Sequence, residues 1–509
     1  MTTQAGAPCR LLRLLILGAV AATAAAMPPD LLEAVPADAW VVLVVDPAGS
    51  TPRGTTQGTA DRPPSALDTA AFLLRQARQM GLTNRVDGQV AAVMDTIASL
   101  PVVVRHPFAV CILRAGARRL PDGGYRLSDL HAALIVRTNG RNTALQSRIQ
   151  QLLNTHVNSE VATIETVRRR THIGHRLLDR RLPGWAVVEW GPVGNCYIVA
   201  LGEGTLDAVA RCLGASDEQR PSLRDDAWFR AAFERCRGES AAALWTVRFH
   251  AIRRGLGLIM TGEPEDVLRG LGLEKTDRGL WSLGFAGRAV EAYSVLHTRP
   301  AGGRPPQDLF RPICRAPSGD WIHTVVPPLA RQFAVIEHAP RDLVLRARDA
   351  YLASRQPSTR AQLRELWSRL ETDTDTSVDR EVLRQLGDRI VIHDAPPHPL
   401  GIPLARTILI EVSGSAAAAR TCLERLLVRA QQHLDRPSAD WASLRLNRAD
   451  DGVWYLQAGL CGPALAITDR WIVIGYSPAA VRRNVAFLQE SSARIEAPSG
   501  PRPTERAEP

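Results

Sequence analysis

Histidine and aspartate lie close together in the segment IHDAPPHP, where they could support general acid–base chemistry. His393 and His398 flank this segment, and Asp394 follows His393 directly. A histidine beside a carboxylate is a common arrangement for proton transfer near neutral pH. The prolines favour a loop as the simpler interpretation. A hydrolase-type site assembled from His393, Asp394 and the distant Asp375 is an alternative hypothesis.

A second pair of histidines has a spacing that could suggest a metal site. His172 and His175 form HxxH within RRRTHIGHR. Structural zinc sites need four ligands, and no third ligand is visible near this pair. The flanking arginines would also repel a cation. The pattern therefore favours an exposed polar turn over zinc.

The acidic stretch ETDTDTSVDRE resembles part of a calcium loop. It places Asp373, Asp375 and Asp379 close together, but it lacks the turn glycine and the closing glutamate of such a loop. A helix start explains it better, with Ser377 as the cap and acidic side chains near the positive helix end. A second helix start is expected at DDAWFRAAFERC, with Asp225 and Asp226 at its N-terminus.

Motifs for nucleophilic or nucleotide chemistry are absent from the sequence: there is no GxSxG, GxGxxG or P-loop. SGSAAAAR, from Ser413, places small residues at a helix start, where backbone N–H groups can bind an anion. Because Arg420 follows a helical turn or more later, a plain cap is favoured. We therefore assign no catalytic, cofactor-binding or metal-binding residue and no cofactor.

Aromatic and cysteine side chains are better explained by packing than by chemistry. We expect four tryptophans to be core residues or sheet anchors rather than a sugar-binding platform: Trp40, Trp281, Trp321 and Trp454. We also expect Trp228, Phe229 and Phe233 to be core residues. No cysteines form CxxC, which excludes a zinc ribbon or thioredoxin-like motif. Most resemble small buried apolar residues, and one disulfide remains possible in an exported chain.

Composition indicates a folded protein. The chain has 509 residues, of which 45% are apolar, and this length suits two to four domains. Its formal net charge is +10, carried by arginine with a single lysine, Lys275. The densest basic run is Arg168–Arg170. Since no aromatic residues interleave with it, a solvated surface is favoured, and we expect no nucleic-acid partner.

The N-terminus has the pattern of a secretory signal. Arg10 and Arg13 precede an apolar run from Leu14 to Ala26, which ends in small residues. This run is shorter than the roughly 20 residues of a membrane span. We expect cleavage after Ala26 and a secreted or periplasmic protein. The alternative is an anchor formed by an uncleaved N-terminal helix.

Two long segments of the chain repeat the same pattern. LIVRTNGRNTALQSRIQQLL from Leu134 and LIEVSGSAAAARTCLERLL from Leu409 each combine a β-rich run, a glycine turn and an amphipathic helix. YIVALGEG from Tyr197 and WIVIGYSP from Trp471 follow them at 63 and 62 positions. Agreement in order, type and spacing predicts a duplicated unit.

Each predicted unit mixes strands and helices. A strand precedes the repeated segment, at FAVCIL from Phe108 and RIVIH from Arg389, and a similar proline-led run begins at Val35 and at Val326. Hairpins within the units indicate antiparallel pairing. The predicted fold class is α+β: two repeated units, each a largely antiparallel sheet with helices packed on one face.

Proline- and glycine-rich stretches mark the boundaries. RPAGGRPPQD is a linker pattern, and the segment after Glu490 has the composition of a disordered tail. We expect a signal peptide at 1–26, a first α+β unit at 30–240, a strand-helix-hairpin block extending it at 241–298, a linker at 299–320, a second α+β unit at 321–490 and a disordered tail at 491–509.

These features together resemble a family. The signal, VPADAWVVLVVDP, SLRDDAWFRAAF, PEDVLRGLGL followed by LWSLGFAGRAVEAY, and the closing WIVIGYSPAAV are similar to exported bacterial proteins grouped as a domain of unknown function, DUF 3352. The resemblance covers about residues 30 to 490. It implies an exported location and an architecture, because the family has no established activity or catalytic residues to carry over.

The sequence therefore predicts an exported protein that is a non-catalytic binding or structural module of the cell envelope. Its expected partner is another envelope protein or surface, and no membrane span is expected in the mature chain unless the N-terminal segment is retained. Two alternatives remain: a hydrolase-type enzyme with a site assembled from distant residues, and a membrane-anchored chaperone or assembly factor.

Overall fold

The protein's structure is a computed structural model that describes most of the chain. It covers residues 29–46, 106–119, 125–138, 162–169, 172–180, 182–214, 219–255, 275–299, 307–353, 357–396, 406–434, 445–457 and 462–496, with the separate positions 143, 146, 147, 150 and 273. The signal segment expected at 1–26 lies outside the described residues, as do His398 and Cys461.

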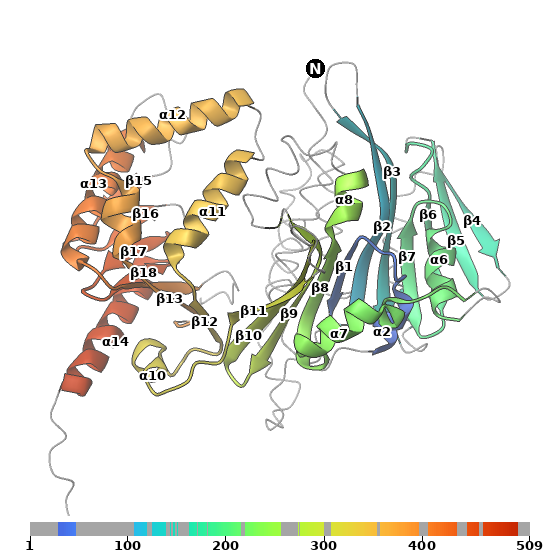
Figure 1. The fold of residues 1–509 in the computed structure, drawn as a ribbon, viewed down its shortest axis with the longest axis horizontal. Helices are drawn as coiled ribbons and strands as arrows, with labels where there is room; N and C mark the ends of the chain where they lie inside the picture. Colours follow the sequence, from blue (N-terminus) through green and yellow to red (C-terminus); the bar gives the residue numbers. More distant parts are fainter. Residues whose placement is uncertain are drawn as a thin grey trace, which may run out of the picture.

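The fold is α+β, as the sequence predicts, and is built on a large sheet. Neighbouring strands pair antiparallel throughout the described residues, apart from a single parallel residue pair between Ala289 and Phe333. This pair joins two runs of strands, which we call the first and the second sheet. Both are visible edge to edge in Figure 1.

The first sheet contains eleven described strands, in the spatial order β4-β5-β6-β7-β3-β2-β1-β8-β9-β10-β11. Their bounds are β1 Val41–Val45, β2 Phe108–Arg119, β3 Tyr125–Arg137, β4 Ala162–Arg168, β5 Ile173–Asp179, β6 Val188–Val193, β7 Cys196–Leu201, β8 Ala241–Arg248, β9 Thr276–Ala286, β10 Ala289–Thr298 and β11 Gln307–Cys314.

The second sheet contains seven described strands, in the order β12-β13-β14-β18-β17-β16-β15. Their bounds are β12 Phe333–Glu337, β13 Leu386–His393, β14 Thr407–Val412, β15 Arg445–Arg448, β16 Trp454–Gln457, β17 Ala464–Ile467 and β18 Trp471–Gly475.

One face of the first sheet carries its main core. Val42, Ile135, Ile198 and Leu244 are fully buried on this face, beneath Phe229 and other residues of the covering helices. These helices lie together along the sheet in Figure 1: α2 Pro29–Ala34, α6 Thr205–Cys212 and α7 Ala227–Arg235, with the short 3₁₀ turns Leu223–Asp225 and Gly238–Ser240 beside α7.

The opposite face of the first sheet is also covered by a helix. Trp245 pairs with Leu43 and with Trp281, so all three point away from the main core. The Trp245 and Trp281 rings stack at 6.0 Å, and Phe249 of α8 (Phe249–Gly255) packs edge-on against Trp281. The expectation of helices on one face is therefore wrong for this sheet, because its second face carries large aromatic side chains that also need cover.

The segment expected as a linker, 299–320, contains a strand instead. Residues 307–314 form β11, which pairs with β10 over seven residue pairs. It is an edge strand and mostly exposed, and Pro312 is tolerated there because an edge strand leaves one side unpaired. An exposed edge strand that contains proline has few apolar residues to distinguish it from a linker, which is why the sequence pattern misled the prediction.

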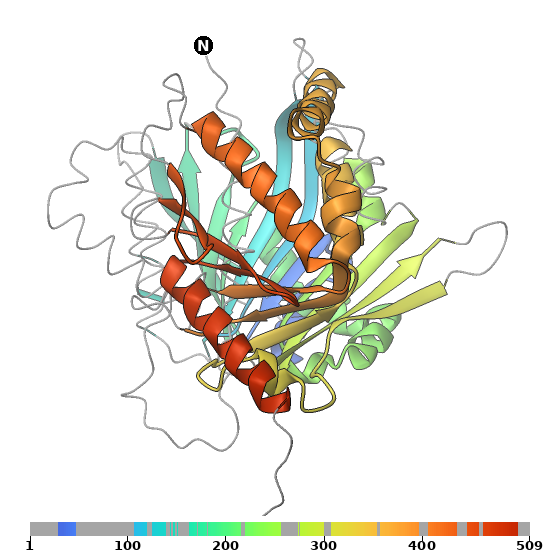
Figure 2. The ribbon, with the colours of Figure 1, turned by 90° about the vertical axis from the view of Figure 1, so that its left-hand side faces the viewer.

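The second sheet has its core beneath α14 (Pro478–Glu496). Val391, Leu409 and Val473 are fully buried against Val481 of this helix. Figure 2 shows α13 (Ala416–Leu434) and α14 in front of the strands. The remaining helical elements are α10 Ile322–Val325, α11 Pro340–Ala353, α12 Pro357–Thr374, the π-helical turn Val378–Val382 and the 3₁₀ turn Leu383–Gln385.

The C-terminal boundary moves relative to expectation. Helix α14 continues to Glu496, and Ser491 is buried on it, so residues 491–496 belong to the fold rather than to a tail. Within the described part of the chain, no helix has both the length and the apolar character needed to cross a bilayer.

Candidate functional site

A row of polar side chains crosses four strands at one end of the first sheet. Arg248, the last residue of β8, pairs with Arg278 of β9. Arg278 pairs with His297 of β10, and His297 pairs with Asp308 of β11. Since directly paired residues point to the same face of a sheet, these four side chains form one line, which we call the polar row.

The polar row continues the main core toward solvent. One step inward on the same face, Leu280 pairs with Val295, and both are fully buried. Side chains on one face of a strand are two residues apart, so the next side chains on this face are Arg278, two residues before Leu280, and His297, two residues after Val295. The strand register thus fixes where the apolar face ends and the charged one begins.

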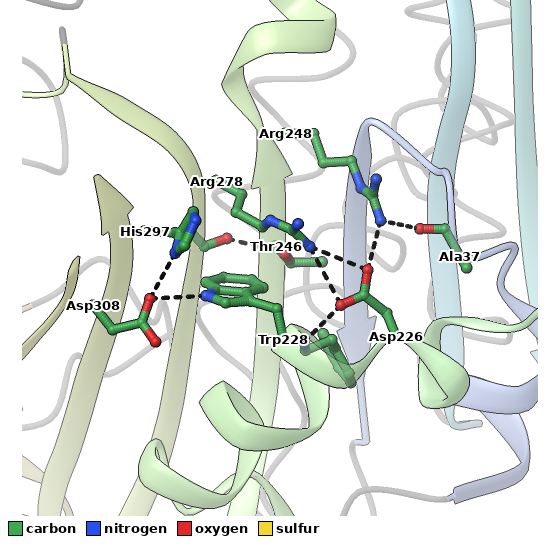
Figure 3. Close-up of polar contacts among 10 residues, drawn as sticks. Ala37, Asp226, Trp228, Thr246, Arg248, Arg278, His297 and Asp308 are labelled. Carbon is green, nitrogen blue, oxygen red and sulfur yellow. Dashed lines mark hydrogen bonds and ion pairs between the residues drawn. The ribbon is translucent and has the colours of Figure 1, made fainter. Parts of the chain in front are cut away.

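Helix α7 covers the polar row through its first residues. Asp226 is the N-cap of this helix, and its carboxylate accepts a hydrogen bond from the backbone N–H of Phe229 at 2.8 Å. The same carboxylate accepts bonds from Arg248 at 2.9 Å and from Arg278 at 3.1 Å (Figure 3). The helix start predicted at Asp225–Asp226 is confirmed, with Asp226 as its cap.

The negative charge of Asp226 offsets the repulsion between two arginines. Arg248 and Arg278 are direct cross-strand partners, and such a pair is destabilising unless a counter-charge lies nearby. Burial and the positive charge of Arg278 lower the pKa of Arg248. The Asp226 carboxylate acts in the opposite direction and reduces this lowering. Arg248 also donates to the carbonyl of Ala37, which ties the segment before β1 to the row.

The other half of the polar row centres on Asp308. Its Oδ1 accepts a hydrogen bond from Trp228 Nε1 at 3.0 Å and lies 2.8 Å from His297 Nδ1 (Figure 3). Partial burial opposes ionisation of Asp308, but the bonds from His297 and Trp228 outweigh it and lower the pKa of this carboxyl. Arg278 also stacks over the Trp228 ring, 5.0 Å from its centroid.

An open pocket of about 340 Å³ lies beside the polar row. It is lined by His250, Asp277, Arg278, His297 and Arg299, which come from α8, β9, β10 and the residue after β10. Arg299 donates to Asp277 through Nε at 2.6 Å. Burial lowers the pKa of His250, so its imidazole is neutral at neutral pH.

Positive charge exceeds negative charge around this pocket. Asp226 is shared by Arg248 and Arg278, and Asp277 is shared by Arg299 and Arg253, the latter at 3.9 Å. Each of these carboxylates therefore faces two guanidinium groups. The arrangement can attract an anion and offer it N–H donors.

The same groups are poorly suited to proton transfer. A general acid or base needs a pKa near the working pH and an uncommitted position. Asp308 is held ionised by two donors, and His250 is held neutral by burial. The chemistry that this arrangement supports is recognition of charge.

The residues of the hydrolase hypothesis have structural partners. His393 ends β13 and is 1% exposed; its Nδ1 accepts a bond from the N–H of Ala395. Asp394 accepts bonds from the N–H groups of Arg331 and Gln332, and the carbonyl of Asp375 accepts from Arg425. His393 therefore bonds within its own loop, whereas Asp394 and Asp375 each bond a distant segment of the chain.

The HxxH pair belongs to a hairpin. His172 lies just before β5 and is 8% exposed, whereas His175 lies within β5 and contacts the Trp190 ring at 5.7 Å between centroids. His172 does lie in the link between β4 and β5, but it is buried rather than exposed. His175 is not in a turn, because the β4–β5 pairing includes it in the strand. Across the described ranges, no group of three or more His, Cys, Asp or Glu residues could hold a metal ion.

The acidic stretch is divided between two elements. Asp373 is in the last turn of α12 and accepts a bond from Arg429. Asp379 is in the following π-helical turn and accepts a bond from Arg341 of α11. A helical turn does begin after Ser377, with Asp379 and Glu381 in its first turn, as expected. The cap itself differs from the expectation, because the Ser377 side chain forms no capping bond and its backbone N–H donates to Glu381 instead. At SGSAAAAR a plain cap is confirmed, since Ser415 Oγ accepts from Ala418 N–H.

One cluster has the residue types of a catalytic triad but the wrong bonding. His131 Nδ1 lies 2.9 Å from the hydroxyl oxygen of Thr205, and Asp129 lies 3.1 Å from Nε2. Thr205 is 1% exposed and donates its own proton to the carbonyl of Leu201. Its hydroxyl proton is therefore directed away from the histidine, as in a packing contact rather than an activated nucleophile.

The sequence did not single out the polar row. Its members end or begin four apolar strands, at WTVR, TDRGLW, SVLHT and QDLF. A polar residue at a strand end is common, so only the pairing register brings these four together. The six described cysteines are buried and free, as most were expected to be.

Comparison with known proteins adds little. No family model matches the sequence, and no curated protein matches it. Crystal forms III and I of TP0453 align at 10% identity over 54% of this chain and 81% and 80% of theirs, with TM-scores of 0.25 and 0.24. Scores this low do not support a shared fold or function.

Proposed function

We propose that the protein is an exported, non-catalytic binding module of the cell envelope. The observation that carries this proposal is the open pocket beside the polar row, where arginines and histidines are held by defined ion pairs and hydrogen bonds. Fixed charged groups around a concave surface suit recognition of a ligand. The sequence predicts another envelope protein or surface as the partner, and the pocket leads us to add a ligand of the envelope to this proposal.

The export part of the proposal rests on the N-terminal pattern. Basic residues followed by a short apolar run and small residues favour a cleaved signal ending at Ala26. The resemblance to DUF 3352 proteins supports the same location and remains a prediction.

We also propose that the two sheets arose from a duplicated unit. In support, β1-β2-β3-β7-β6-β5-β4 and β12-β13-β14-β18-β17-β16-β15 are linked by antiparallel pairings in corresponding order. The chain also enters a helix after the last strand of each set, α6 after β7 and α14 after β18.

Expression of the full chain in a bacterial host tests the export part of the proposal. The expected result is a mature N-terminus at Met27 by Edman sequencing, and recovery of the protein in the periplasmic or envelope fraction. A cytoplasmic chain that keeps Met1 would overturn the export proposal. A membrane-bound chain with an intact N-terminus would favour the anchored alternative instead.

A further inference from the structure

We propose that the pocket beside the polar row binds a small oxyanion, the phosphate or carboxylate group of a low-molecular-weight ligand. This inference deepens the proposed binding function and rests on it for its biological setting. Its chemistry rests on the pocket alone. The residues that would contact the anion are Arg278, Arg299, His250 and His297.

The two arginines line the pocket and use only part of their donor capacity on carboxylates. Both hydrogen bonds from Arg278 to Asp226 come from Nη1, and Arg299 reaches Asp277 through Nε. A guanidinium carries five N–H donors in a planar fork that matches carboxylate and phosphate geometry. Further N–H groups can thus serve a ligand without breaking the ion pairs.

The ion pairs also hold the two arginines in place. Arg278 is fixed by Asp226 and by the Trp228 ring, and Asp277 fixes Arg299. A side chain that is already ordered loses less entropy on binding, which favours affinity. The shared carboxylates leave a surplus of positive charge, so an anion adds attraction and does not need to displace an acid.

The histidines add further polar groups to the pocket. His297 is oriented by Asp308, and His250 lies at the start of α8. The His250 ring already forms a hydrogen bond with the backbone of Asp277, so its other nitrogen would accept a hydrogen bond from a protonated oxyanion. A volume of about 340 Å³ lies at the small end of the range for ligand pockets, which favours a small molecule over a chain.

Titration calorimetry on the purified mature chain tests the inference at low salt. The probes are phenyl phosphate, citrate and, as a cationic control, choline. The expected result is saturable binding of phenyl phosphate or citrate but not of choline, and the preferred anion identifies the source of the oxyanion. Affinity should fall as salt is raised, because screening weakens partly exposed charges.

Two variants test whether the anion binds in this pocket. Arg299→Gln should weaken anion binding about tenfold or more, the factor expected for losing a hydrogen bond to a charged group. Arg482→Gln is the matched control: Arg482 also bonds an aspartate, Asp451, through Nε at 2.5 Å, and it is 48% exposed against 51% for Arg299. This control should bind as the unmodified chain does.

The imidazole signals of His250 supply a second measurement, since they should shift on addition of the anion and not of choline. The inference is overturned if neither anion binds saturably, or if Arg299→Gln and Arg482→Gln weaken binding equally. Because these measurements use purified protein, their failure leaves the export proposal intact. Conversely, anion binding by a chain that is not exported would remove only the envelope setting.

Discussion

The two sheets follow corresponding strand orders but bury different sides of the matched sequence. Leu134 pairs with Val199 in the first sheet, and both are only half-buried. Leu409 pairs with Val473 in the second sheet, and both are fully buried beneath α14. In the first sheet it is the neighbouring Ile135 that is fully buried, on the face that α6 covers.

Their polar strand ends differ in a related way. In the first sheet, Arg248 and Arg278 reach solvent and are balanced by Asp226. In the second, His393 ends β13 inside the protein, beside Thr407, whose hydroxyl donates to the carbonyl of Ala395. Access to water decides the chemistry: charges persist where they are partly hydrated, and a buried strand end carries neutral hydrogen-bonding groups.

The largest expected effect comes from matched leucine truncations. Leu409→Ala should cost about 3 kcal/mol, because it removes a fully buried side chain and leaves a cavity. Leu134→Ala should cost about 1 kcal/mol, since part of that side chain is already exposed. Urea denaturation measures both losses, provided that the dependence of unfolding free energy on urea concentration is the same in the variants and the unmodified chain. Equal losses would mean that the two faces are covered alike, and the difference between the sheets would disappear.

These two leucines also show what the sequence could and could not predict. Their segments have the same order and spacing, which suffices to predict strands, helices and an α+β fold. Successive side chains in a strand point to opposite faces, so an offset of one residue exchanges the buried and exposed sets. The helix that covers one face is placed by long-range packing, which the local pattern does not record.

The same reasoning applies to the candidate site. Asp226 was predictable as a helix start, because an acidic residue before an apolar run is a local signal. The polar row was not, because it depends on the register of four strands spread over 61 positions, from Arg248 to Asp308. No spacing rule links residues that meet only through neighbouring strands.

The buried end of β13 should make stability depend on pH. Burial lowers the pKa of His393 from 6.5 to about 4. Between these two values the unfolded chain binds a proton that the folded chain excludes, so stability falls as pH drops through this window and is unaffected above it. A difference of this size corresponds to at most about 3 kcal/mol.

His393→Gln isolates this effect. The variant removes the titrating group, so the difference in unfolding free energy between it and the unmodified chain should shrink as pH falls from about 6.5 to 4. Urea titrations at several pH values measure it. A difference that stays constant across the window would show that His393 accepts its proton in the folded state, as an exposed histidine does.

Removing the counter-charge of the polar row should have the next largest effect. Asp226→Ala loses the cap of α7 and leaves Arg248 and Arg278 facing each other, which should cost about 2 kcal/mol. Asp226→Asn keeps an oxygen that can accept from Phe229 and loses only the charge, so it should cost less. Urea midpoints at 0.05 and 1 M salt separate the terms, because salt screens only the charge.

A smaller effect is expected on the Asp308 side of the row. Trp228→Phe keeps an aromatic ring beneath Arg278 but removes the Nε1 donor, which should cost about 1 kcal/mol or less. The pKa of Asp308 should rise toward its ordinary value, because one of the two donors that lower it is lost. Carboxyl NMR titration of the variant follows this change. An unaltered pKa would mean that His297 and the nearby Arg235 suffice to hold this carboxylate ionised.

The smallest effect concerns the exposed arginines. Arg299→Gln should change the unfolding free energy by no more than about 0.5 kcal/mol, because its pair with Asp277 is half-exposed and side-chain entropy offsets most of the attraction. Arg482→Gln, on the second sheet's helix α14, should behave alike. Urea midpoints measured side by side test this. If Arg299→Gln alone were destabilising by 1 kcal/mol or more, Arg299 would be holding the end of the first sheet together, and its pair with Asp277 would be a structural contact without an equivalent at Arg482 in the second sheet.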